Sequence, residues 1–229
     1  MPKFRTISRW IFGTMICLLT GIAHAERPLR ILYFQAPAGA PEKACIYSAD
    51  SMVMETELPR HNFSENIIIP KGDVTLRFLP KQLDDGAEMP IGAPGVKIPS
   101  GWQKVLLLVA ESKENSVLPI RLKAINASDS VFGPGSIYMM NLSKIRVGGT
   151  VGDKKLDLRP SSVEIIKNPI SGNGFYPTKL FSVATQGARP QRFIKQMWKK
   201  DDATRQVLFI LPKPAPQYAT YYCAPIEGL

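Results

Sequence analysis

Residues 137–169 read IYMMNLSKIRVGGTVGDKKLDLRPSSVEIIKNP, and this stretch decides the fold class. Its apolar and polar residues alternate in short runs, as expected for strands with one buried face, and Gly or Pro interrupts the runs every few positions. Gly152-Asp153 suits the tight turns whose twist matches that of antiparallel strands. We interpret the stretch as two β-hairpins placed end to end.

The rest of the chain shows the same alternation, so we predict an all-β protein. The expected fold is an antiparallel β-sandwich, immunoglobulin-like in general architecture, that forms one body or two packed sandwich lobes. Segments 80–101 and 126–136 are rich in Gly, Pro or small polar residues and are expected to be long loops. Long loops on a rigid scaffold often carry binding sites.

A faint internal repeat favours two lobes. Residues 104–108 (KVLLL) resemble residues 206–210 (QVLFI), and Ile46-Tyr47 resembles Ile137-Tyr138 at the start of a run. The competing interpretation is that the strands of any β protein resemble one another, because they share one side-chain pattern. The predicted organisation is a signal peptide at 1–25, an N-terminal β lobe at 26–112 and a C-terminal β lobe at 117–229.

The first 25 residues have the three parts of a secretory signal peptide. Lys3, Arg5 and Arg9 give a basic start, residues 11–23 are mostly apolar, and Ala23-His24-Ala25 supplies the small residues expected before a cleavage site. The apolar run is shorter than the roughly 20 residues that a membrane-spanning helix needs. We therefore predict cleavage near Ala25 and a secreted or periplasmic protein, and a short signal of this kind suits a bacterial host.

The net charge is moderately positive. It is +10 for the full chain, and removal of the three basic residues of the leader leaves +7. A surplus of this size favours peripheral or weak contact with anionic surfaces and does not by itself indicate nucleic acid. No later stretch is apolar enough to predict a transmembrane span.

Cys45 and Cys223 are the only cysteines that follow the leader. In an oxidising compartment they could form a disulfide that ties the start of the fold to its last strand. They could equally be two buried free thiols that act as small apolar side chains. The sequence leaves both interpretations open.

The residue types that common catalytic sites require are scarce. His61 is the only histidine after the leader and lies in a polar loop, so triad chemistry and the usual zinc sites are not expected. A hydrolase could work with carboxylates alone, for example Asp84 and Asp85, but adjacent acids on a loop are usually solvated. We expect no enzyme, no cofactor and no metal site.

Basic and aromatic residues near the C-terminus are the best binding candidates. Residues 193–211 are expected to form a hairpin with Asp201-Asp202 at its tip. The leading hypothesis is a non-catalytic envelope or periplasmic protein that binds a protein partner or supports an assembly. The alternative is a module that binds cell-wall glycans on aromatic platforms. The candidate binding residues are Trp102, Arg192, Lys195, Trp198, Tyr218 and Tyr221.

Overall fold

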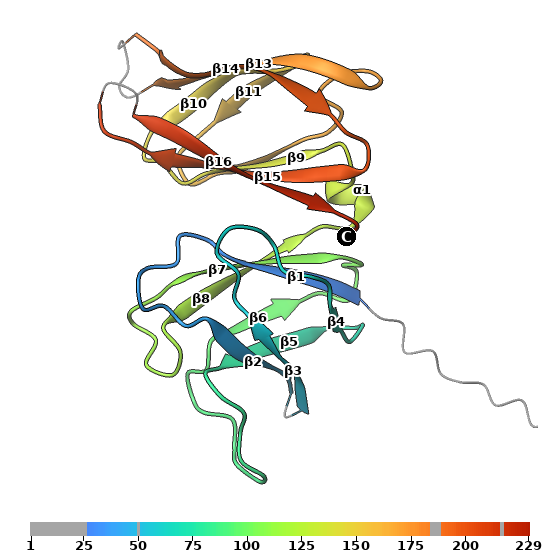
Figure 1. Ribbon diagram of the computed structural model, residues 1–229, viewed down its shortest axis with the longest axis vertical. Coiled ribbons are helices and arrows are strands. Elements are labelled where there is room, and N and C mark those ends of the chain that lie inside the picture. Colours follow the sequence, from blue (N-terminus) through green and yellow to red (C-terminus); the bar gives the residue numbers. More distant parts are fainter. Residues whose placement is uncertain (1–26, 50, 184–188, 216–217) are drawn as a thin grey trace, which may run out of the picture.

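The computed structural model describes residues 27–49, 51–183, 189–215 and 218–229, so the predicted signal peptide lies outside the described residues. Within these ranges, strands β1 to β16 form four four-stranded sheets, which we name A to D. The sheets pack face to face in two pairs, which confirms the predicted all-β sandwich (Figure 1). Among the described residues, no helix is long and apolar enough to cross a membrane.

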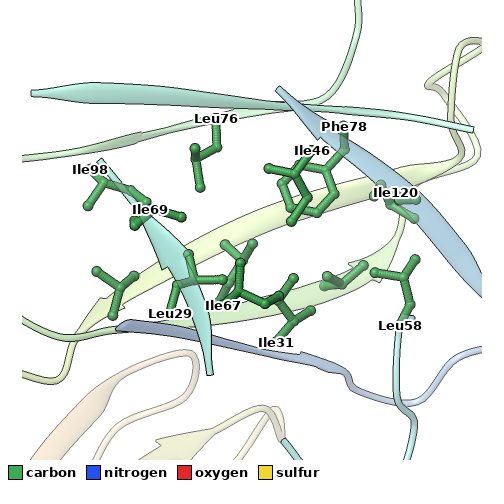
Figure 2. Close-up of a cluster of buried hydrophobic side chains, with 14 of the residues drawn as sticks. Leu29, Ile31, Ile46, Leu58, Ile67, Ile69, Leu76, Phe78, Ile98 and Ile120 are labelled. Carbon is green, nitrogen blue, oxygen red and sulfur yellow. The ribbon is translucent and has the colours of Figure 1, made fainter. Parts of the chain in front are cut away.

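Sheets A and B form the first lobe. Sheet A has the order β4-β1-β7-β8 and sheet B the order β3-β2-β5-β6. Apolar side chains from both sheets, among them Leu29, Ile31, Ile46 and Phe78, pack in the space between them (Figure 2). The strands are β1 (Arg27–Tyr33), β2 (Lys43–Ser48), β3 (Ser51–Glu57), β4 (Ile67–Ile69), β5 (Val74–Leu79), β6 (Gly95–Ile98), β7 (Val105–Glu111) and β8 (Ile120–Asn126).

Sheets C and D form the second lobe around a second apolar core. Sheet C has the order β12-β9-β15-β16 and sheet D the order β11-β10-β13-β14. A short helix, α1 (Asp129–Phe132), precedes the first of these strands. The strands are β9 (Ile137–Asn141), β10 (Arg146–Val151), β11 (Lys154–Leu158), β12 (Val163–Ile166), β13 (Gly174–Val183), β14 (Gln191–Lys200), β15 (Thr204–Pro212) and β16 (Ala219–Glu227).

The two lobes have the same strand order. In each, the first strand pairs in parallel with the seventh, so β1 lies beside β7 as β9 lies beside β15. The match between residues 104–108 and 206–210 therefore joins equivalent strands. The match between Ile46-Tyr47 and Ile137-Tyr138 joins β2 to β9, which are not equivalent, because strand partners rather than local pattern define the correspondence.

The stretch that decided the fold class forms one hairpin instead of two. Strands β10 and β11 pair across the predicted Gly152-Asp153 turn, whereas β9 pairs with β12 in the opposite sheet. Gly152 has φ +56°, and a Cβ there would lie 2.1 Å from the carbonyl oxygen of Pro169, so the turn requires glycine. In sequence, the hairpin therefore lies between two strands, β9 and β12, that pair with each other in sheet C.

Several expected boundaries differ from those observed. Strand β8 pairs with β7, and Leu118 and Ile120 lie in the first core, so the chain leaves the first lobe after Asn126 and not within 113–116. The expected loop at 80–101 contains strand β6, and α1 lies within 126–136.

The hairpin expected at 193–211 does not form. Both of its strands exist, but β14 belongs to sheet D and β15 to sheet C, so Asp201-Asp202 connects two layers. An alternating sequence predicts each strand, but a turn between consecutive strands does not reveal whether they pair or separate into facing sheets.

Sheets A and C pack against each other and join the lobes, which gives the layer order B-A-C-D (Figure 1). Leu32 and Leu106 of sheet A meet Val207 and Phe209 of sheet C in a third apolar cluster. The four residues have exposed fractions of 0%, so the joint between the lobes is a true core.

A charged joint lies beside this cluster. The buried Arg205 donates hydrogen bonds to the carbonyl oxygen of Phe132 and, over 2.8 Å, to the Asp129 carboxylate. Lys104, which directly precedes β7, donates to the same carboxylate over 2.9 Å. Asp129 therefore bridges the two lobes electrostatically.

Candidate functional site

The outer face of sheet D exposes large apolar side chains next to lysines. Strand β13 alternates strictly: Tyr176, Thr178 and Leu180 are buried, so Phe175 and Lys179 project from the opposite side of the sheet. This face lies at the end of the layered stack that is farthest from the first lobe (Figure 1).

Two large apolar side chains are exposed on this face. The exposed fraction is 69% for Phe175 and 60% for Met197. They come from neighbouring strands, because Phe175 is opposite Lys199 and Met197 is opposite Pro177 in the β13–β14 register. Exposed apolar groups that lie together and are rimmed by charge often mark interaction sites.

Lysines surround these apolar side chains. Thr150 is opposite both Lys155 and Lys179, and Lys179 is opposite Lys195, so three lysines lie in one row across the four strands. Like charges directly opposite each other destabilise a sheet. No ion pair to these lysines occurs in the part of the chain that the structure describes.

We call this surface the basic face. It combines exposed apolar groups with uncompensated positive charge on a rigid sheet, and it can therefore bind a partner that is anionic and partly apolar. It comprises Lys155, Phe175, Pro177, Lys179, Arg192, Lys195, Met197 and Lys199.

Two of the predicted binding residues belong to the basic face. Arg192 is opposite Phe181, and Lys195 is opposite Lys179, and both are exposed. Sequence reasoning missed Phe175 and Met197. Their alternation with buried Tyr176 and half-buried Trp198 was the available signal, but it could not show which strand lies beside which.

Two other predicted residues, Trp198 and Tyr221, meet on the inner side of the lobe. Their ring centroids are 6.2 Å apart, and Trp198 also lies edge-on to Tyr176 at 6.4 Å. The Trp198 indole and the Tyr221 hydroxyl both donate to Oε1 of Gln196, over 3.1 and 2.7 Å. This cluster packs between β14 of sheet D and β16 of sheet C at one edge of the lobe. Burial in it raises the pKa of Tyr176 to about 12.

Trp102 and Tyr218 lie apart from both groups. Trp102 packs against the first core, and its carbonyl oxygen accepts a hydrogen bond of 3.1 Å from the buried Arg27. Tyr218 precedes β16 in a left-handed conformation, with φ 59°. The predicted binding residues therefore do not converge on a single site.

Cys45 and Cys223 are both free thiols, so the disulfide interpretation is wrong in this structure. Cys45 lies on the outer side of sheet B with Tyr47 and Leu79, whereas Cys223 belongs to sheet C and packs against the second core. Sheet A lies between them. Burial raises the pKa of the Cys45 thiol and raises that of Cys223 to about 11, so neither is an activated nucleophile.

Two polar residues in connecting segments, His61 and Asp201, make contacts that hold the fold together. The His61 main-chain carbonyl oxygen accepts a hydrogen bond from the Tyr222 hydroxyl, which links the two lobes. Asp201 holds the β14–β15 connection: hydrogen bonds from the Ala203 amide and the Thr204 hydroxyl lower its pKa. Within the described ranges, no group of three or more His, Cys, Asp or Glu residues could hold a metal ion.

Comparison with known proteins adds no assignment. No family model matches the chain, and a search of curated proteins found no match.

Proposed function

We propose that this chain is an exported, non-catalytic binding protein of the bacterial envelope, and that its basic face attaches it to an anionic membrane surface. One observation carries the proposal: the row formed by Lys155, Lys179 and Lys195 lies beside the exposed Phe175 and Met197 on one face of sheet D.

The row of lysines supplies the long-range attraction. Each basic residue held near an anionic lipid surface contributes about 1 kcal/mol, and this attraction decays within roughly a Debye length of 10 Å at 0.1 M salt. Anionic headgroups would also relieve the repulsion between the opposed Lys179 and Lys195. Binding by this face is therefore expected to weaken steeply as salt rises.

The exposed apolar side chains supply a short-range contribution. Phe175 and Met197 can enter the interfacial region of a bilayer while the neighbouring lysines remain at headgroup level. A purely electrostatic contact would not need them, and protein interfaces are usually depleted in lysine at their centres. The combination favours a lipid surface over an acidic protein.

A glycan-binding function has less support from the geometry. Sugar rings stack on exposed aromatic faces, but Trp198 and Tyr221 are half-buried, pack against each other and share Gln196 as a hydrogen-bond partner. Trp102 packs on the first core. The sequence pattern of residues 1–25 supports export. The single histidine after it, His61, lies in the loop between β3 and β4 and supports a role without catalysis.

Co-sedimentation with lipid vesicles tests the proposal. The processed protein is expected to sediment with vesicles of phosphatidylglycerol and phosphatidylcholine at low salt, and not with vesicles of phosphatidylcholine alone. Lys179→Glu/Lys195→Glu should abolish sedimentation, and Phe175→Ser/Met197→Ser should weaken it. Lys71→Glu/Lys81→Glu, at exposed positions of the first lobe, is the control of equal charge change.

Failure to bind anionic vesicles at low salt would overturn the membrane assignment. Retention on native envelopes that is lost after their proteins are digested would instead identify a protein partner. Recovery of the uncleaved chain from the cytoplasm would contradict export.

A further inference from the structure

A groove opens between the two lobes, remote from the basic face. It has a volume of about 540 Å³ and lies between sheets A and C, where β7 ends and β8 begins. Leu108 of sheet A and Met140 of sheet C line it, and the stacked rings of Phe34 and Phe209 form one wall. Ligand pockets commonly have volumes of 300 to 1,000 Å³ and apolar walls.

The mouth of this groove is cationic for a reason visible in the strand register. Directly opposed residues of an antiparallel pair project to the same side, and Ile125, Lys123 and Arg121 are opposite Leu106, Leu108 and Ala110. The inter-lobe face of β8 therefore changes from a buried apolar residue, Ile125, to two exposed cations where the groove opens.

These two cations lack a carboxylate partner in the described ranges. Neither Arg121 nor Lys123 forms an ion pair there, and Glu111, the acidic residue of the groove, lies 3.9 Å from the Lys113 ammonium instead. An excess of positive charge above an apolar pocket is complementary to a molecule with an apolar body and an anionic head.

The backbone beside the groove is also unusual. Gln35 has a left-handed conformation, with φ 53°, and lines both this groove and a neighbouring cavity of about 390 Å³ that His61 and Tyr222 help to form. Such conformations are costly for residues other than glycine and cluster at binding and catalytic sites.

We infer that the inter-lobe groove binds a small amphiphile with a single carboxylate, such as a medium-chain fatty acid. Its apolar chain lies between Leu108 and Met140, against the Phe34–Phe209 stack. Its carboxylate accepts hydrogen bonds from the Arg121 guanidinium and the Lys123 ammonium, groups that match carboxylate geometry and charge. This site does not depend on the basic face.

Isothermal titration with decanoate, kept below its micelle concentration and without vesicles, tests the site. Wild-type protein is expected to bind one decanoate per chain, and Arg121→Gln/Lys123→Gln should weaken binding by at least about tenfold, as expected for loss of charge-assisted hydrogen bonds. Lys179→Gln/Lys195→Gln removes the same charge from the basic face and should leave the affinity unchanged.

A second variant and a second ligand sharpen the test. Leu142 lines the groove with 39% of its surface exposed, so Leu142→Glu should fold and abolish decanoate binding by repulsion. Decan-1-ol should bind at least about tenfold more weakly than decanoate. The inference is overturned if wild-type protein binds no decanoate, if Arg121→Gln/Lys123→Gln binds it normally, or if the alcohol binds equally well.

Discussion

Phe34 and Phe209 stack across the boundary between the lobes, with ring centroids 3.9 Å apart and planes 15° from parallel. Phe34 follows the last residue of β1 in sheet A, and Phe209 is a buried residue of β15 in sheet C. The Tyr222 ring packs against both, and its hydroxyl donates a hydrogen bond to the His61 carbonyl oxygen of the first lobe. The lobes are therefore held as one body by an aromatic joint.

Removal of this aromatic contact is expected to lower the stability of the protein. Phe209→Ala should lower the free energy of unfolding by about 3–5 kcal/mol, because a fully buried ring leaves a cavity between the lobes. Phe175→Ala removes an equal ring from an exposed position and should change stability by less than about 0.5 kcal/mol. Urea denaturation compares the two, and equal losses would contradict the proposed joint.

Asp129 should make stability depend on pH in acid. Burial alone would raise its pKa, but the hydrogen bonds from Lys104 and Arg205 hold it below its ordinary value. The folded pKa is then lower than the unfolded pKa of about 3.9, so this carboxylate stabilises the protein above about pH 4. The contribution is lost as pH falls through the folded pKa.

Asp129→Asn should therefore lower stability at neutral pH and flatten its decline below about pH 4. The expected loss is about 1–2 kcal/mol, kept small because 56% of the Asp129 side chain is exposed and solvent screens the ion pair. Asp157→Asn, in the exposed pair with Arg146, is the control and should change neutral stability far less. A pH profile for Asp129→Asn identical to that of wild type would contradict this role.

Gly149 should tolerate no side chain. Its φ is +149°, and a Cβ there would lie 2.0 Å from the Lys179 carbonyl oxygen on the neighbouring strand. Gly149→Ala should destabilise the fold by at least about 2 kcal/mol because the strained backbone and the clash act together. Gly148→Ala meets its nearest neighbour at 3.7 Å and should be mild, so thermal unfolding of the two variants isolates the effect.

Thiol counting should find two reactive cysteines in an unfolded, unreduced chain that begins at residue 26, since Cys45 and Cys223 are free. In the folded protein both should react slowly with a thiol reagent at pH 7, because burial raises both pKa values and leaves little thiolate. Unfolded protein with no reactive thiol would show that the two are bridged.

The sequence predicted strands well because their signal is local. The Gly152-Asp153 turn and the alternation in 174–183 depend on neighbouring residues only. It failed where partners are distant. Nothing near β9 indicates that β12 is its partner, and nothing near Asp201 indicates that the chain changes sheets.

The candidate surface could be predicted only in part for the same reason. Arg192 and Lys195 were recognised as basic residues of one segment, but Lys155 and Lys179 join them only through the order of sheet D. Trp198 is close in sequence to Arg192 and Lys195, but side chains alternate along a strand, so Trp198 lies on the opposite face of the sheet from Lys195. Strand order and register decide which side chains share one face of a sheet, and the local sequence pattern contains neither.

The matching strand orders of the lobes have a consequence for biosynthesis. The first lobe has all its strands once residue 126 has been made, yet its surface around Leu32 and Leu106 is fully covered only when β15 and β16, the last strands of the chain, complete sheet C. A nascent chain therefore has an incompletely covered apolar surface on its first lobe until its last strands have been made. Truncation before residue 204 removes the Val207 and Phe209 side chains from this cluster, so the first lobe is expected to associate with other chains through the same apolar surface.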